Sequence, residues 1–250
     1  MESINVNSLP LIQNSSIHNI EFEELYLAVR KKECRLYSNN EVRHLPSVPS
    51  DHIHFHEWEI RKRSSQKLIS YLSKKNRKLT ILEVGCGNGW LSARLSEIKE
   101  AEVTGVDINT PEIKQAQGVF NYQNLTFIAG DIHDLQKQEK QFDCIIFAAS
   151  LQYFPESMEV CDVALSMLNK EGEIHILDTY FYKDITHAIE RSKKYYQELG
   201  FPGMTGYYFH HSLKQLKRYH YLLMFNPGSL KNKFFLKKDP FPWIVIRKKC

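Results

Sequence analysis

The sequence lacks several features that would assign it to other classes of protein. No stretch of its 250 residues approaches the roughly 18 consecutive apolar residues that a membrane-spanning helix needs. The chain starts Met-Glu-Ser-Ile-Asn-Val-Asn-Ser, with no basic start and no long apolar stretch, so we expect no signal peptide. With 42% hydrophobic and 25% charged residues, the composition also excludes intrinsic disorder and collagen-like repetition.

Cysteine is sparse and unfavourably spaced for two kinds of site. An odd count of five, without any Cys-x-x-Cys pair, is untypical of a disulfide framework or a zinc site. The five are Cys34, Cys86, Cys144, Cys161 and Cys250. We therefore expect reduced thiols and a cytoplasmic protein.

Three alternating histidines, His52, His54 and His56, are the remaining metal candidates. They would share one side of an extended segment, but only Glu57 and Glu59 lie close by as further ligands. A metal centre is not expected here.

Neither sign of charge dominates the chain. The 33 Lys and Arg residues exceed the 29 Asp and Glu residues by four, far from the strongly basic surface of a dedicated nucleic-acid binder. Basic residues do gather near the C-terminus, but only Phe234 and Phe235 interleave with them and Asp239 interrupts them. A solvated basic face is the expectation, with RNA binding as the alternative. The bases are Lys231, Lys233, Lys237, Lys238, Arg247, Lys248 and Lys249.

The middle of the chain alternates short apolar runs with helical patterns. Runs of this kind are typical of a parallel sheet covered by helices on both faces, which right-handed crossovers wind into a double layer. We predict strands over 79–84, 103–107, 125–129, 142–148 and 173–180, and helices over 90–98, 111–120 and 157–168. The fold class is therefore a doubly wound, mostly parallel α/β sheet.

The two ends of the chain depart from this alternation. After a helix over 184–199, strands over 221–225 and 243–247 are joined by a loop, which predicts an antiparallel strand at the sheet edge. Before the sheet we expect helices over 21–32 and 57–74, separated by a loop over 33–56. We therefore divide the chain into a loose tail (1–20), an N-terminal helical cap (21–76) and a main domain (77–250).

The most informative segment is a glycine loop between a strand and a helix. Gly85, Gly87 and Gly89 alternate where the chain must turn sharply and where a ligand can approach the backbone. Asp107 ends the next strand, beside this loop in an open parallel sheet, where its carboxylate can accept hydrogen bonds from ribose hydroxyls. The alternative for Asp107 is the N-cap of the helix that starts near Pro111.

A second acidic residue ends the third strand. Asp131 can accept hydrogen bonds from the exocyclic amine of an adenine, while Ile132 packs on the ring. A cap or turn residue is the alternative for Asp131.

Together these motifs resemble the class I S-adenosylmethionine-dependent methyltransferases, in a small-molecule branch similar to methyltransferase type 11. The resemblance rests on Glu83-Val-Gly-Cys-Gly-Asn-Gly89, Val-Asp107, Gly130-Asp131 and the strand that starts at Phe142. It implies a Rossmann-like sheet of seven strands whose last strand is antiparallel. It also implies that the cofactor S-adenosylmethionine contacts Glu83, Gly85, Cys86, Gly87, Gly89, Asp107, Ile108, Asp131, Ile132, Ala148, Ala149 and Ser150.

A nicotinamide-dependent dehydrogenase is the rival for the same loop. Its fingerprint G-x-G-x-x-G needs a small residue where this chain carries Trp90, so the bulky indole disfavours that reading.

The segment after the fourth strand, 147–154, lacks the Asn/Asp-Pro-Pro-Tyr/Phe motif of members that methylate nucleobases or glutamine amides. The resemblance therefore implies a small-molecule acceptor, with an RNA methyltransferase or a non-catalytic nucleoside-binding module as alternatives. The oligomeric state stays open.

Candidates for contact with the acceptor follow the fourth and fifth strands and a glycine-rich stretch. Packing or surface roles remain the alternative for each, and a general base is needed only if the acceptor starts protonated. Trp58 and Arg61 of the N-terminal region are candidates for contact with the cofactor's carboxylate end or with the acceptor. The other candidates are Tyr153, Asp178, Tyr180, Tyr182, His210 and His211.

Overall fold

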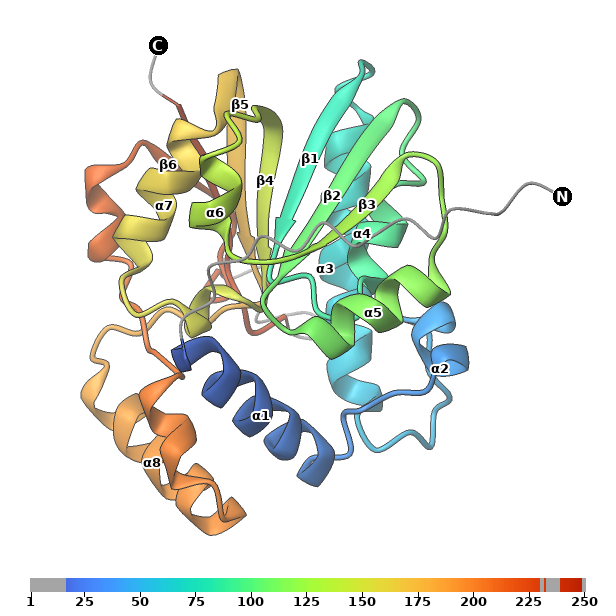
Figure 1. Cartoon of the computed structure of the whole chain (residues 1–250). Helices are drawn as coiled ribbons and strands as arrows, with labels where there is room; N and C mark the ends of the chain where they lie inside the picture. The colour runs from blue at the N-terminus through green and yellow to red at the C-terminus, as the bar shows by residue number, and fades with distance from the viewer. Residues whose placement is uncertain (1–16, 230–231, 233–238, 249–250) are drawn as a thin grey trace, which may run out of the picture.

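The computed structural model describes residues 17–229, 232 and 239–248. These residues form one seven-stranded sheet with the strand order β3-β2-β1-β4-β5-β7-β6 (Figure 1). The strands are β1 Leu79–Val84, β2 Ala101–Asp107, β3 Leu125–Ala129, β4 Phe142–Ala148, β5 Leu168–Leu177, β6 Tyr221–Phe225 and β7 Trp243–Arg247.

The topology of the sheet confirms the predicted fold class. Strands β1 to β5 pair in parallel, and β7 lies antiparallel between β5 and β6. The order reverses between β1 and β4, so the carboxyl ends of these two strands border the crevice in which doubly wound sheets bind ligands.

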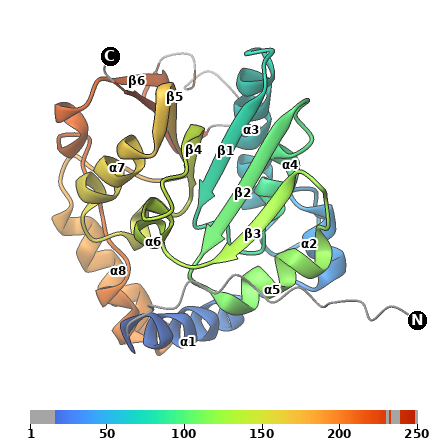
Figure 2. The same ribbon diagram turned by 45° about the horizontal axis from the view of Figure 1, so that its top comes forward.

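Helices cover both faces of the sheet, as Figure 2 shows from a second direction. The α-helices are α1 Ile17–Lys32, α2 Asn39–His44, α3 Phe55–Ser73, α4 Trp90–Leu95, α5 Thr110–Val119, α6 Ile132–Gln136, α7 Ser157–Ser166 and α8 Thr186–Leu199. The 3-10 helices are η1 Leu151–Tyr153, η2 Pro202–Gly206 and η3 Gln215–Arg218.

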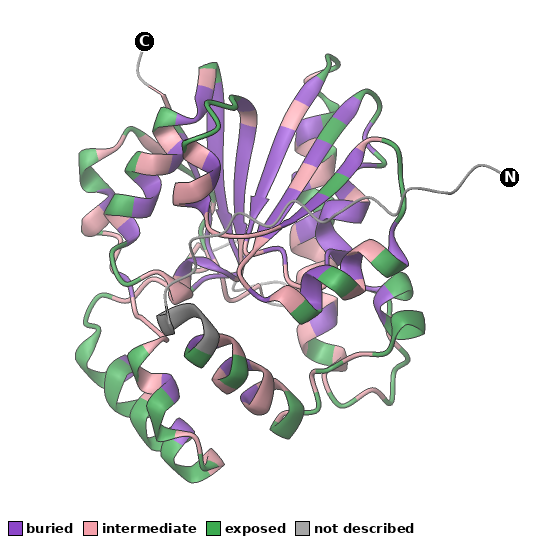
Figure 3. Cartoon of the chain, viewed as in Figure 1, coloured by how far each residue is buried: buried purple, intermediate pink, exposed green. Residues whose placement is uncertain are grey.

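Alternation along the strands sends side chains into two separate cores. In β1, Ile81 packs with the core under α2 to α5, whereas Leu82 packs with the core under α6 and α7. Because helices cover both faces of the central strands, these strands are the most buried part of the chain (Figure 3), whereas the edge strand β6 is largely exposed.

A third apolar cluster lies beyond the carboxyl ends of the strands. It joins α1, α8 and η2 through Phe22, Tyr26, Val29, Tyr196 and Met204. Figures 1 and 2 show α1 and α8 beyond the carboxyl ends of the strands. This cluster therefore covers the sheet edge at which the glycine loop lies, and we call it the roof.

Several predicted boundaries were wrong for local reasons. The predicted loop over 33–56 contains α2, because Ser38 and Glu41 form a capping box that starts a helix. Helix α6 was not predicted, and Asp131 caps it. Strand β5 begins at Leu168, where the preceding helix was expected to end, and finishes at Leu177.

The division into a cap over 21–76 and a main domain over 77–250 stays a proposal. Helix α3 contributes Trp58, Leu68 and Leu72 to the core on one face of the sheet, so this part of the proposed cap packs as an integral layer. Residues 17–20 belong to α1, and the rest of the expected tail lies outside the described residues.

None of the helices in the described part of the chain has the length and apolar character that a membrane crossing requires.

Gly89 should be a position at which folding requires glycine. Its φ is +77°, and a Cβ atom would lie 2.5 Å from the Phe127 ring and 2.8 Å from the Cβ of Ala116. Gly89→Ala should lower the free energy of unfolding by roughly 2–4 kcal/mol, through overpacking and left-handed strain. Chemical denaturation measures this loss.

Gly118→Ala is the matched control, because it adds the same methyl group in α5 where no atom lies within 4 Å. It should leave stability unchanged or raise it by up to about 1 kcal/mol. Equal effects of the two substitutions would contradict the assigned role of Gly89.

Candidate active site

A cavity of about 360 Å³ opens at the carboxyl ends of β1, β2 and β4. Its volume lies in the range of roughly 300–1,000 Å³ that is typical of ligand pockets. Of the residues predicted to contact a cofactor, only Gly89 is absent from the lining. The eleven that line the cavity are Glu83, Gly85, Cys86, Gly87, Asp107, Ile108, Asp131, Ile132, Ala148, Ala149 and Ser150.

The glycine loop has the backbone conformation that its sequence demands. Gly85, Gly87 and Gly89 all have positive φ angles, between 52° and 77°. A Cβ at Gly87 would lie 3.1 Å from Oε2 of Glu112, which also lines the cavity, so a side chain here would fill space open to a ligand. Gly89, the N-cap of α4, lies against Phe127 and Ala116 and does not line the cavity, so its contact with the cofactor stays a prediction.

Asp107 is held rigidly beside this loop. Its Oδ2 accepts a hydrogen bond from the Gly87 amide and its Oδ1 accepts one from the Asn109 amide, both at 2.8 Å. The alternative role of helix cap was wrong, because Asn109 is the N-cap of α5 and accepts from the Glu112 amide. Asp107 therefore lies against the cavity with both oxygens oriented and lone pairs to spare.

Two further carboxylates are buried in the same wall. Burial raises the pKa of Glu83 to about 8, although its carboxylate accepts a hydrogen bond from Ser92. Burial also raises the pKa of Glu112 to about 7, and its Oε2 has no hydrogen-bond partner among the described residues. Glu112 was not predicted from the sequence.

Asp131 caps a helix at the edge of the cavity. Its carboxylate accepts a hydrogen bond from the His133 amide at 2.7 Å and caps α6, and the residue also lines the cavity. The first residue of that helix, Ile132, is buried and adds an apolar patch.

The segment after β4 closes the opposite wall. Ser150 donates a hydrogen bond to the Val84 carbonyl at 2.6 Å, which ties the end of β4 to β1. Ala149 adopts a positive φ of 54° and borders both this cavity and a second cleft. This segment therefore separates the two spaces.

Helix α1 supplies a wall that sequence reasoning missed. Phe22, Tyr26 and Arg30 line the cavity from positions four residues apart on one side of the helix. Arg30 donates a hydrogen bond to the Tyr26 hydroxyl at 2.9 Å and makes no ion pair in the described part of the chain. The stripe of two aromatic rings and one guanidinium was the sequence signal available.

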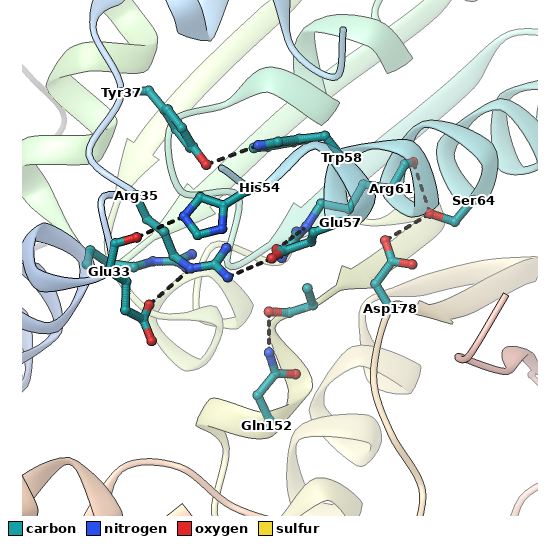
Figure 4. Close-up of polar contacts among 12 residues, drawn as sticks. Glu33, Arg35, Tyr37, His54, Glu57, Trp58, Arg61, Ser64, Gln152 and Asp178 are labelled. Carbon is teal, nitrogen blue, oxygen red and sulfur yellow. Dashed lines mark hydrogen bonds and ion pairs between the residues drawn. The ribbon is translucent and has the colours of Figure 1, made fainter. Parts of the chain in front are cut away.

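A network of ion pairs borders both cavities. Glu57 lies 2.6 Å from Arg35 and 2.9 Å from Arg61, and Figure 4 shows both guanidinium groups directed at it. Burial opposes the ionisation of Glu57, but the two arginines outweigh it and lower its pKa to about 2. Trp58 also lines the first cavity and donates to the Tyr37 hydroxyl at 3.0 Å.

The second cleft, of about 810 Å³, shares Arg30, Arg61, Ala149 and Tyr153 with the first cavity. It extends between α1 and α8. Of the four catalytic candidates, Tyr153 and His210 line it.

The other two catalytic candidates lie elsewhere. Asp178 accepts a hydrogen bond from Ser64 at 2.9 Å beside a small separate cavity, and burial raises its pKa to about 6. His211 is buried, and its Nε2 lies 3.0 Å from the Leu151 carbonyl oxygen. Neither residue lines the cavity or the cleft.

Two of the alternating histidines form hydrogen bonds within the N-terminal region. The His54 amide donates to Nδ1 of His52 at 3.0 Å, and Nε2 of His54 lies 2.8 Å from the Glu33 carbonyl oxygen. No group of three or more metal-ligating side chains was found among the residues that the structure describes.

The cavity fits a cationic nucleoside. Buried carboxylates with raised pKa values, an unpartnered carboxylate oxygen on Glu112 and a glycine loop open to ligand suit a ligand with amino and hydroxyl groups. A pyrophosphate would meet three acidic side chains in the same wall and is disfavoured.

This fold and this site define a class I methyltransferase domain. Residues 75–226, more than half of the chain, match the family described as methyltransferase domain, and the chain belongs to that family. The sequence-based identification of the family, with its S-adenosylmethionine cofactor, is thereby confirmed.

The matches to curated relatives cover only part of each relative's length. A malonyl-acyl-carrier-protein O-methyltransferase of Priestia megaterium is 34% identical over 99 residues, which cover 38% of this chain and 36% of the relative. Trans-aconitate 2-methyltransferase of Escherichia coli is 28% identical over 144 residues, covering 57% and 55%. The chain thus spans about half or less of the length of these curated relatives.

Among solved structures, magnesium protoporphyrin IX methyltransferase of Synechocystis PCC 6803, with bound S-adenosylhomocysteine, has a TM-score of 0.60 at 16% identity. The match covers 93% of this chain and 99% of that chain. At this identity the likeness shows the fold.

The raised pKa of Glu83 predicts a pH dependence of stability in the ligand-free protein. Between its ordinary pKa near 4.5 and about 8, Glu83 holds a proton only in the folded state, so stability falls as pH rises across this window. The slope should reach about 1.4 kcal/mol per pH unit at most for this one proton. Denaturant unfolding over pH 5 to 8 measures it.

Glu83→Gln retains a partner for Ser92 without a titrating group, so it should make the slope shallower by up to that amount, while Glu112 and Asp178 continue to contribute. Glu171→Gln at an exposed position should leave the slope unchanged. A Glu83→Gln curve parallel to that of the wild type would refute the assignment.

Proposed function

We propose that the protein transfers a methyl group from S-adenosylmethionine to a small-molecule acceptor. One observation carries the proposal. An acid-lined cavity adjoins a cleft of about 810 Å³ across a wall that includes Ala149 and Tyr153. Two substrates held on either side of this wall would meet there.

The residues of the first cavity suit distinct parts of the cofactor. Asp107 has both oxygens oriented by backbone amides and would accept from the ribose hydroxyls. Glu83 would attract the ammonium group, and Asp131 and Ile132 would hold the adenine. When bound, S-adenosylmethionine supplies a methyl group already activated by a positively charged sulfur.

The chain's own contribution is alignment and the exclusion of water. The roof formed by Phe22 and Tyr26 covers the cavity, and the wall at Ala149 and Tyr153 would position the acceptor. Holding two reactants in line accounts for a large part of the barrier reduction in a displacement reaction. A general base is needed only if the acceptor atom carries a proton, and His210 is then the better placed histidine.

The size of the cleft, about 810 Å³, favours a small molecule or a small group on a carrier. The relatives named above are described as acting on malonyl-acyl-carrier protein and on trans-aconitate, both of which carry carboxylates. The cleft is large enough to hold an acceptor of that size.

The C-terminal basic residues that the structure describes do not support the RNA alternative, because both have partners within the chain. Arg247 pairs with Glu173 at 3.0 Å, and Lys248 donates to the Leu168 carbonyl at 2.7 Å. The other C-terminal bases, Lys231, Lys233, Lys237, Lys238 and Lys249, lie outside the described residues. Transfer of labelled methyl groups from the cofactor to the RNA fraction of a cell extract would favour this alternative, and binding without any transfer would favour the non-catalytic module.

S-adenosylhomocysteine should bind, and Asp107→Ala should weaken its binding by roughly 1–3 kcal/mol, about 5- to 150-fold. The loss follows from removal of charge-assisted hydrogen bonds and of the partner of the Gly87 amide. Isothermal titration calorimetry measures both values.

Asp51→Ala, at an exposed turn, is the matched control and should bind like the wild type. Absence of binding by the wild type at millimolar ligand would refute the proposed function, and an unchanged affinity of Asp107→Ala would limit Asp107 to a structural role.

A further inference from the structure

The second cleft is unusually rich in tyrosine. Seven of the thirteen tyrosines in the chain line it. They are Tyr26, Tyr153, Tyr180, Tyr182, Tyr195, Tyr196 and Tyr208. Tyr180 and Tyr195 are nearly half exposed, at 47% and 46%, although large aromatic side chains gain most from burial. The cleft therefore offers aromatic surface that the fold itself does not cover.

The rings are arranged as a continuous strip. Ring centroids are separated by 5.7 Å from Tyr153 to Tyr208, 5.4 Å from Tyr208 to His210 and 5.3 Å from His210 to Tyr182. Tyr180 continues the strip 5.9 Å beyond Tyr182. Because Tyr153 also lines the cofactor cavity, the strip leads from the expected place of methyl transfer to the outer end of the cleft.

The charges in the cleft do not balance. Four arginines and two glutamates line it, which leaves an excess of two positive charges. Arg35 and Arg61 are paired with Glu57, and Arg35 also with Glu33. The two arginines without an ion pair in the described residues are Arg30, at the boundary of the two cavities, and Arg191.

Arg191 lies at the outer end of the aromatic strip. It projects from α8, and its guanidinium carbon is 5.9 Å from the centroid of the Tyr182 ring. An exposed guanidinium beside aromatic rings is a favourable partner for a carboxylate, which it can bind through two parallel hydrogen bonds.

We propose that the cleft binds a flat, extended, aromatic or conjugated carboxylic acid as the methyl acceptor. Its rings lie along the strip from Tyr153 to Tyr182, its carboxylate pairs with Arg191, and the reacting atom at its other end lies beside Ala149. The assignment of the bound acid as the methyl acceptor rests on the proposed function. The binding preference itself can be measured without turnover.

The test uses protein saturated with S-adenosylhomocysteine and three probes, which are biphenyl-4-carboxylate, biphenyl-4-carboxamide and octanoate. Calorimetry should show that the aromatic acid binds at least about fivefold more tightly than either the neutral amide or the aliphatic acid. Equal affinity of acid and amide, or tighter binding of octanoate, would overturn the proposal, as would the absence of binding by biphenyl-4-carboxylate at millimolar concentration.

Arg191→Gln should remove the preference for acid over amide, and Arg191→Lys should retain part of it. Lys193→Gln, at an exposed position of the same helix outside the cleft, is the matched control and should behave like the wild type. An acid preference that survives in Arg191→Gln would overturn the role of Arg191. Affinity for S-adenosylhomocysteine, measured first in each sample, should not change, and its loss in the wild type would count against the proposed function rather than the acceptor class.

Discussion

The burial of three carboxylates at one edge of the sheet is the constraint on which the site depends. Glu83, Asp107 and Glu112 share the wall of one cavity, where desolvation penalises the charged form of each and raises its pKa. Their protein partners are two backbone amides for Asp107 and the hydroxyl of Ser92 for Glu83. A ligand that brings positive charge and hydroxyl donors would offset the desolvation penalty of these carboxylates, which the fold alone does not offset.

The same arrangement explains why the glycine loop and the roof have their composition. Gly87 carries no side chain, so the space in front of Glu112 remains open, and its backbone amide orients Asp107. Helix α1 closes the cavity with Phe22 and Tyr26, which exclude water and thereby strengthen each charge interaction inside. Beyond the wall the character changes from acidic to cationic and aromatic, and this contrast is the basis for proposing separate places for the cofactor and the acceptor.

Much of the site could be predicted because it follows local rules. A carboxylate at the end of a parallel strand lies beside the preceding loop, whichever helices surround it, so Asp107 and Asp131 could be placed from the sequence. The contributions of Glu112 and Arg30 could not, since both depend on how α5 and α1 pack against the edge. His211 is buried by its neighbours instead of lining the cleft, and no sequence pattern distinguishes a buried histidine from one that lines a cleft.

The most direct test of the account is the proton balance of cofactor binding. Titration with S-adenosylhomocysteine at pH 7, in buffers of different ionisation enthalpy, gives the number of protons released. A ligand ammonium beside Glu83, whose pKa is about 8 without ligand, must favour the ionised carboxylate. The account predicts net proton release that is reduced in Glu83→Gln. Binding with no proton exchange, or with proton uptake, would contradict it.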